Sequence, residues 1–183
     1  MDEREQAMIM TNDRIPKLEN DLSRIISFNE NCDNKSSIVM GGVLAISALI
    51  VGLNGSSFSD YYRNNDISVP GAIVFVLLVI SMISIIVGLS FIICSLFARM
   101  GIGDHDNADS LIFYGSIASK GCDGYRESVS SRTDDDYVSD LMDQIYINSV
   151  ICTRKYRMYN TGLSFSVSGT ILLFICSIVR FFF

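Results

Sequence analysis

The residues best suited to binding a charged ligand are three closely spaced bases, Arg154, Lys155 and Arg157. Arginine and lysine donate charge-assisted hydrogen bonds to phosphate, so several copies of this group would form a phosphate-binding ring. The same bases also come just before an apolar stretch, where basic residues mark the cytoplasmic end of a membrane span. Two interpretations therefore stand: a topology anchor first, and a ligand-binding ring second.

Other residue types with catalytic or metal-binding chemistry lack the spacing that such sites need. The single histidine, His105, lies between Asp104 and Asp106, and none of the five cysteines forms a Cys-x-x-Cys pair. A zinc site needs three or four ligands at helical or loop spacing. The sequence also has no Gly-rich phosphate loop and no nucleophile with a nearby base. We therefore expect no catalytic residues, no metal, no cofactor and no enzymatic activity.

Small and uncharged polar residues recur at helical spacing inside the apolar stretches. Because the charged residues of these stretches, Arg99 and Arg180, lie only at or near their ends, a proton relay or a coupled transporter is disfavoured. A pore would have to be lined by uncharged groups, although the same residues also mediate plain helix packing in lipid. The pore-lining candidates are Ser81, Ser84, Gly88, Ser95, Thr161, Ser164 and Ser168.

Composition is that of a small membrane protein. Of 183 residues, 49% are hydrophobic, two are proline and none is tryptophan. A positive mean hydropathy accompanies this apolar content. The formal net charge of −6 argues against a general nucleic-acid binder, which needs a basic face to neutralise phosphates.

Three apolar stretches are predicted to span the membrane: residues 36–53, 69–99 and 161–183. A helix needs about 20 apolar residues to cross the hydrocarbon core. Basic residues concentrate before the first span and between the second and third, so these regions are assigned to the cytoplasm. Residues 54–68 then form a periplasmic loop, and the C-terminus is periplasmic as well.

The remaining segments predict an all-α membrane protein with helices outside the bilayer. Residues 1–35 contain an amphipathic helix that begins near Asp13, because Pro16 is tolerated in a first helical turn. It either packs on the long helix described below or bundles with other copies. Residues 100–160 consist of two parts. The part up to residue 132 contains Gly and Ser, is expected to be irregular and could act as a plug or lid. A long helix follows it.

That long helix is predicted to start after Thr133, whose hydroxyl and following acids suit a helix N-terminus. Apolar residues then recur every three or four positions, and no proline interrupts them. The cytoplasmic helix is therefore continuous with the third span, about 50 residues and roughly 75 Å long.

Three motifs resemble a known family. They are Asp33-Asn34-Lys35-Ser36-Ser37 before the first span, Leu111 to Ala118 with its aromatic pair and Gly, and Leu141 to Ile145 leading through Ser149 to Lys155 and Tyr156. Their order resembles the Pycsar-type transmembrane effector domain, a membrane component of bacterial anti-phage signalling systems. The membrane effector of the related Hailong system is similar. The motif residues with an expected structural role are Asp33, Lys35, Phe113, Tyr114, Gly115, Gln144, Ser149 and Tyr156.

The resemblance implies a partner and an activity. A companion nucleotidyltransferase or cyclase would supply a cyclic nucleotide or oligonucleotide, and this signal would control the membrane effector. The effector would depolarise or permeabilise the bacterial inner membrane, most simply as an ion channel. Since three helices cannot enclose a pore, a homo-oligomer is expected, with a tetramer favoured. The alternative is a non-conducting anchor or scaffold that recruits a soluble partner.

Overall fold

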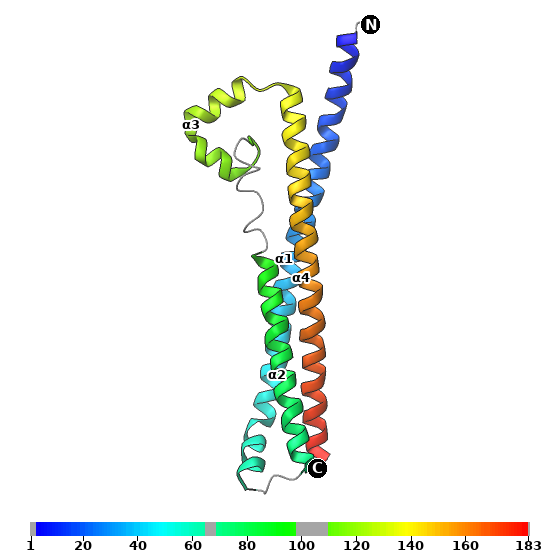
Figure 1. Cartoon of the computed structure of the whole chain (residues 1–183), viewed down its shortest axis with the longest axis vertical. Helices are drawn as coiled ribbons and strands as arrows, with labels where there is room; N and C mark the ends of the chain where they lie inside the picture. The colour runs from blue at the N-terminus through cyan, green and yellow to red at the C-terminus, as the bar shows by residue number, and fades with distance from the viewer. Residues whose placement is uncertain (1–2, 65–68, 98–109, 183) are drawn as a thin grey trace. The chain divides into compact units, whose positions relative to one another are not determined.

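The computed structural model describes the backbone of residues 3–64, 69–97 and 110–182, and the side chains of residues 14–53, 55, 69, 71–97 and 110–179. This part of the chain consists of four α-helices without a strand: α1 Glu3–Asn64, α2 Val69–Leu96, α3 Tyr114–Ser130 and α4 Asp134–Phe182 (Figure 1). Three of them, α1, α2 and α4, contain stretches long and apolar enough to cross a membrane. The predicted all-α membrane fold with a long C-terminal helix is confirmed.

Helix α1 is longer than predicted at both ends. It begins at Glu3 instead of near Asp13, and Pro16 lies inside it. The preceding residues are mostly good helix formers, and a proline removes only one backbone hydrogen bond, so the helix continues across it. At the other end, α1 continues to Asn64 through most of the segment predicted as a loop, while residues 65–68 lie outside the described part.

Helix α3 corrects the expectation that the chain is irregular up to residue 132. Its glycines and serines suggested a loop, yet the structure departs from helical geometry inside α3 at a single residue, Gly121, with φ 69° and ψ 171°. Only glycine adopts this backbone region readily, because it has no Cβ. The helix is therefore two short helical pieces joined by a kink.

Helix α4 begins where the sequence predicts. Thr133 Oγ1 accepts a hydrogen bond from the Asp136 N–H at 3.2 Å. In return, Asp136 Oδ2 accepts from the Thr133 N–H at 3.0 Å and from its hydroxyl at 2.6 Å. This reciprocal pair is a capping box, which satisfies backbone donors that a helix start leaves open.

The chain divides into two compact units: unit 1 comprises residues 1–31 and 98–154, and unit 2 comprises residues 32–97 and 155–183. Helices α1 and α4 each contribute residues to both units. Unit 2 contains the apolar parts of three helices, and its core is formed by Val43, Ile50, Ile85 and Leu173.

Within unit 2, α2 and α4 approach each other through glycines. A Cβ on Gly88 would overlap Ser166 Oγ and lie 2.5 Å from the Ser166 backbone nitrogen. A Cβ on Gly162 would lie 2.7 Å from the Gly88 carbonyl oxygen, and one on Gly169 would lie 3.0 Å from the Ile85 nitrogen. The two backbones are therefore in direct contact, the close approach that small residues allow between helices in lipid.

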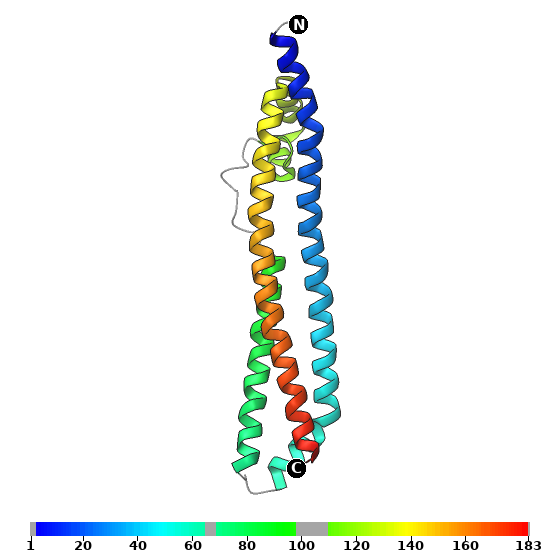
Figure 2. The same ribbon diagram turned by 90° about the vertical axis from the view of Figure 1, so that its right-hand side faces the viewer.

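Within unit 1, the first part of α1 packs beside the first part of α4, as both ribbon views show (Figure 2). Leu22 from α1 and Leu141 from α4 are buried. The Tyr137 hydroxyl donates to Glu19 at 2.6 Å, and Asn29 Nδ2 donates to the Asn148 carbonyl at 3.3 Å. Of the two interpretations for the N-terminal helix, packing on the long helix is thus present in a single chain.

Candidate functional site

The three predicted bases do not share one environment. The Lys155 side chain is only 5% exposed, and its Nζ lies 2.7 Å from both carboxylate oxygens of Asp33. Arg154 and Arg157 are exposed. Asp33 therefore compensates the charge of Lys155 inside unit 2. A phosphate-binding ring that used Lys155 would first have to break this ion pair. The anchor and ring interpretations of the two arginines both stay predictions.

The predicted pore-lining residues separate into buried and exposed groups. Ser81, Gly88 and Ser95 are buried in unit 2, and the Ser95 hydroxyl lies 3.1 Å from that of Ser36 on α1. Ser84 donates to the Phe165 carbonyl at 2.8 Å. These residues therefore contribute to packing within one chain.

The remaining pore-lining candidates are on α4. Thr161 is partly buried, and its hydroxyl donates to the Arg157 carbonyl at 3.0 Å. Ser164 and Ser168 are exposed on the same helix. These two hydroxyls are consequently the ones most accessible to a neighbouring chain or to a water-filled path.

Unit 1 contains an open polar pocket of about 400 Å³ that the sequence analysis missed. Its walls come from the α3 arm, which we define as residues 110–132, and from the first turns of α4. Cations Lys120 and Arg132, the hydroxyls of Ser128, Ser131 and Ser139, and the amide of Gln144 line it. Three carboxylates, those of Asp136, Asp140 and Asp143, also reach the pocket.

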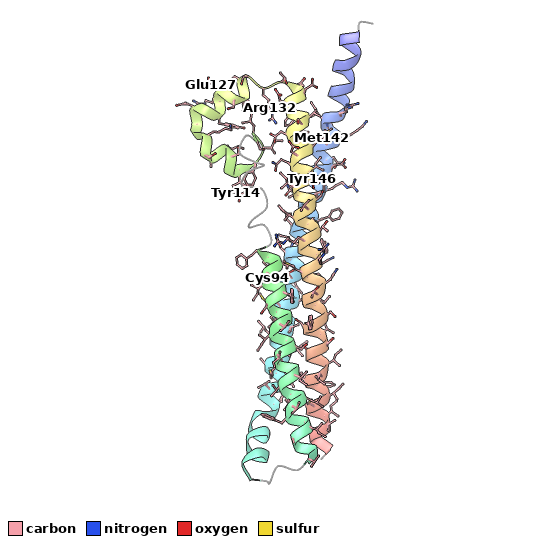
Figure 3. All side chains as sticks on the ribbon, viewed as in Figure 1. Cys94, Tyr114, Glu127, Arg132, Met142 and Tyr146 are labelled. Atoms are coloured by element: carbon pink, nitrogen blue, oxygen red, sulfur yellow. The ribbon has the colours of Figure 1, made fainter. Side chains whose placement is uncertain are left out.

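Asp140 holds both ends of the α3 arm. Its carboxylate accepts hydrogen bonds from the Ser110 hydroxyl at 2.6 Å and from the Leu111 N–H at 2.9 Å. It also forms a 2.6 Å ion pair with Arg132 Nη2, and both side chains are 15% exposed or less. Figure 3 labels Arg132 at the α4 end of the arm and Tyr114 near its other end. One carboxylate therefore closes a loop of the chain.

Ser110 extends this network. Its hydroxyl oxygen accepts from the N–H groups of Ile112 at 3.2 Å and Phe113 at 3.1 Å, which holds the turn that leads into α3. The buried Gln144 side chain donates to the same oxygen at 3.3 Å. Gln144 lies one helical turn after Asp140 on the same face of α4, so the two side chains reach the arm together.

The charges around the pocket are already partly paired. Hydrogen bonds from Thr133 lower the pKa of the Asp136 carboxyl below its ordinary value of 3.8, and Arg132 contributes electrostatically. The Arg132 guanidinium also lies 4.5 Å from the centre of the Tyr137 ring. A hydrogen bond to Glu19 raises the pKa of Tyr137 above its ordinary value. Arg132 is thus the residue at which ionic and aromatic contacts meet.

The other motif residues have local roles. The rings of Phe113 and Tyr114 lie 4.7 Å apart, and a Cβ on Gly115 would lie 2.7 Å from the Phe113 ring. Ser149 donates to the Ile145 carbonyl at 2.7 Å. Lys35 is exposed and Tyr156 is partly buried. Arg99 and His105 fall outside the described residues.

Sequence reasoning singled out Gln144 but missed Ser110, Arg132 and Asp140. The sequence analysis assigned no role to Asp140. The available signal was its spacing of four from Gln144, which places both on one helical face. Its partners at residues 110 and 132 could be found only from the fold.

These features define a class of protein: an all-helical membrane protein that combines three apolar spans with a polar helical unit carrying a pocket. The chain belongs to the Pycsar effector family, because the family described as Pycsar effector protein domain matches residues 17–181. It is 30% identical over 171 residues to the Pycsar effector protein GmPycTM of Gulbenkiania mobilis. The alignment covers 84% of this chain and 86% of that protein. No solved structure is significantly similar. The resemblance noted in the sequence is confirmed, and the chain is a membrane effector of anti-phage defence.

Proposed function

We propose that this protein is a nucleotide-controlled effector that permeabilises the bacterial inner membrane as an oligomeric channel. The observation that carries the proposal is the dual role of α1 and α4, each of which contributes residues to the polar unit and to the apolar unit. A signal bound by the polar unit thus acts on helices that enter the membrane. The N-terminus is cytoplasmic and the C-terminus periplasmic in this proposal.

An oligomer follows from how the chain uses its own small residues. Gly88, Ser81 and Ser95 are buried between helices of one chain, so they are not free to line a path through it. A water-filled path then lies between copies, with a tetramer favoured, and the exposed Ser164 and Ser168 of α4 are its candidate lining. Depolarisation of the infected cell is the outcome, and a companion cyclase or nucleotidyltransferase supplies the nucleotide.

A non-conducting scaffold is the second candidate function, supported by exposed apolar side chains on unit 1. Tyr114 is 67% exposed and Tyr146 is 71% exposed, which offers a soluble partner two aromatic contacts. In this alternative, the spans only hold the protein at the membrane.

Ion flux from liposomes separates the two candidates. Purified protein is reconstituted, and leakage of a trapped ion is measured with and without each 3′,5′-cyclic ribonucleotide. Flux that changes with a nucleotide supports the channel, whereas tight liposomes under every condition contradict it and favour the scaffold. Empty liposomes and the same nucleotides serve as the control.

The lining is tested by cysteine substitution in a background whose native cysteines are replaced by serine. Modification of Ser168→Cys and Ser164→Cys with a charged thiol reagent is expected to reduce flux at least several-fold. Ile171→Cys, exposed on the same helix, is the matched control and should be unaffected. Equal inhibition at all three positions would remove Ser164 and Ser168 from the path.

A further inference from the structure

We propose that the polar pocket of unit 1 is the binding site for the phosphate-bearing signal, and that the ligand acts by taking Arg132 away from Asp140. This inference rests on the proposed nucleotide control and adds where the nucleotide binds and which contact it changes.

The size of the pocket limits its occupant. Small-molecule pockets have volumes of roughly 300–1,000 Å³, and this one, at about 400 Å³, is near the lower end. A single nucleotide fits such a space, whereas a chain of several nucleotides would extend beyond it. Of the two kinds of signal that the sequence analysis left open, the pocket favours a mononucleotide.

The lining matches a molecule that carries both a phosphate and hydrogen-bond donors. Lys120 from α3 and Arg132 from the end of the arm supply positive charge, and arginine binds phosphate oxygens in a bidentate manner. Hydroxyls of Ser128, Ser131 and Ser139 add neutral partners. The pocket carboxylates accept from the amino and hydroxyl groups that a nucleotide also carries, so a bare inorganic anion is a poorer match.

Arg132 is the contact that a ligand phosphate changes. Its partner, Asp140, is an internal anion at 2.6 Å, so the guanidinium already holds a carboxylate where a phosphate oxygen would bind. Exchange of the carboxylate for a phosphate oxygen keeps the guanidinium paired, so it avoids the cost of leaving a largely buried charge without a partner. Asp140 keeps two donors, Ser110 and Leu111, after the exchange.

The exchange frees one end of the α3 arm only. Without Arg132, the link from the arm's α4 end to Asp140 is lost, while Ser110 and Leu111 still tie the other end. Gly121, whose backbone already forms a kink, divides the arm into these two parts. The ligand thus loosens residues 122–132, which lead directly into α4, and leaves residues 110–120 in place.

Binding to the full-length protein in detergent tests the site, with calorimetry and the four 3′,5′-cyclic ribonucleotides as probes. Arg132→Gln and Lys120→Gln should each weaken binding of the responding nucleotide at least tenfold, because a hydrogen bond to a charged group is lost. Arg126→Gln is the matched control, since Arg126 is exposed on α3, pairs with Asp123 and does not line the pocket. It should change affinity less than twofold.

Hydrogen exchange tests the switch. In the wild type, the nucleotide should accelerate amide exchange of residues 122–132 and leave residues 110–120 unchanged. Asp140→Asn, which weakens the hold on Arg132 without removing the arginine, should raise exchange of residues 122–132 before any nucleotide is added. This variant keeps the test valid if Arg132→Gln fails to fold.

Three results of the binding and exchange measurements would overturn the inference. They are no binding of any probe by the wild type, wild-type affinity in Arg132→Gln, and uniform slowing of exchange across the arm on binding. Flux that responds equally to nucleotide in the wild type and in Arg132→Gln would reject the pocket and keep the channel. If nucleotide binding depends on Arg132 but the liposomes never leak, the pocket is kept as the binding site and the channel is rejected.

Discussion

Each of the two units is stabilised internally by a different kind of contact. In unit 2, α2 and α4 touch through backbone atoms at Gly88, Gly162 and Gly169, where an added Cβ would meet backbone atoms of the neighbouring helix at 2.5–3.0 Å. In unit 1, the α3 arm is held by directional hydrogen bonds that converge on Asp140. Close packing is lost when either surface changes, whereas a hydrogen bond can exchange its partner. Unit 2 is therefore the more rigid of the two units, and unit 1 is the more adjustable.

The largest effect is expected from adding a methyl group to the α2–α4 contact. Gly88→Ala and Gly162→Ala should each destabilise the protein by about 3 kcal/mol, the upper part of the range for overpacking, because backbone atoms must move. Thermal unfolding in detergent measures the loss.

Gly41→Ala is the control for this substitution, since nothing lies within 4 Å of a Cβ at Gly41. Alanine is a better helix former than glycine, so this variant should be stabilised by up to about 1 kcal/mol. Equal destabilisation at positions 41 and 88 would show that contact with a neighbouring helix does not decide the effect of an added methyl group.

Breaking the Asp33–Lys155 ion pair is expected to have the next largest effect. Lys155→Ala leaves a carboxylate beside a buried site and should cost about 3 kcal/mol, reduced to the extent that water reaches Asp33, whose side chain is 40% exposed. The exchange Asp33→Lys with Lys155→Asp should restore part of the loss. Lys35→Ala, on the exposed face of α1, should change the melting temperature little; a large change there would contradict the pairing.

Removing the carboxylate of Asp140 tests the hydrogen-bonded side of the comparison. Asp140→Ala leaves Arg132, Ser110 and the Leu111 N–H without their acceptor, and should cost about 2 kcal/mol. The loss should be confined to unit 1, so amide exchange should rise in residues 110–132 and stay unchanged in α2. Asp143→Ala is the control, because Asp143 is exposed. Faster exchange throughout both units would argue against separate mechanisms of stabilisation.

The helix cap at the start of α4 should contribute less. Thr133→Ala removes the hydroxyl that accepts from the Asp136 N–H, and N-cap losses are about 1 kcal/mol. Thr133→Ser keeps the hydroxyl and should restore the wild-type melting temperature. A serine variant as unstable as the alanine variant would show that the methyl group matters, not the cap.

The smallest effect is a pH dependence at the same cap. Because the folded pKa of Asp136 lies below the ordinary value of 3.8, the ionised carboxylate stabilises the folded state at higher pH. That contribution is complete above about pH 4 to 5 and is lost as the pH falls from 3.8 through the lower folded pKa. Unfolding measured between pH 3 and 6 should show a shallower acid loss in Asp136→Asn than in the wild type.

Features encoded in neighbouring residues could be predicted from the sequence. The four residues from Thr133 to Asp136 predict the start of α4, and the apolar stretches predict the membrane spans. The start of α1 could not be predicted from Pro16, because the good helix formers before it outweigh one missing hydrogen bond. The glycines and serines of α3 wrongly predicted a loop. The serines instead form hydrogen bonds within the helix, as Ser128 does when it donates to the Gly124 carbonyl at 2.8 Å.

Features that depend on distant residues could not be predicted. Asp33 and Lys155 were both singled out by resemblance, yet nothing in a single sequence pairs side chains 122 positions apart. The pocket likewise requires Ser110 and Arg132 to meet at Asp140, and local periodicity carries no information about that meeting. Functional bases were therefore sought in the visible cluster at 154–157, while the structure offers a pocket formed by residues 110–144.

The kink at Gly121 has a consequence for the reach of the α3 arm. A straight helix of the 17 residues in α3 would be about 25 Å long, and its two ends would be held that far apart. Both ends of the arm nevertheless meet one carboxylate, which requires the chain to double back on itself between them. A side chain at position 121 would oppose that reversal by straining the backbone. The span over which Asp140 can act therefore depends on the conformation of one glycine, at which an added Cβ would have no atom within 4 Å apart from its chain neighbours.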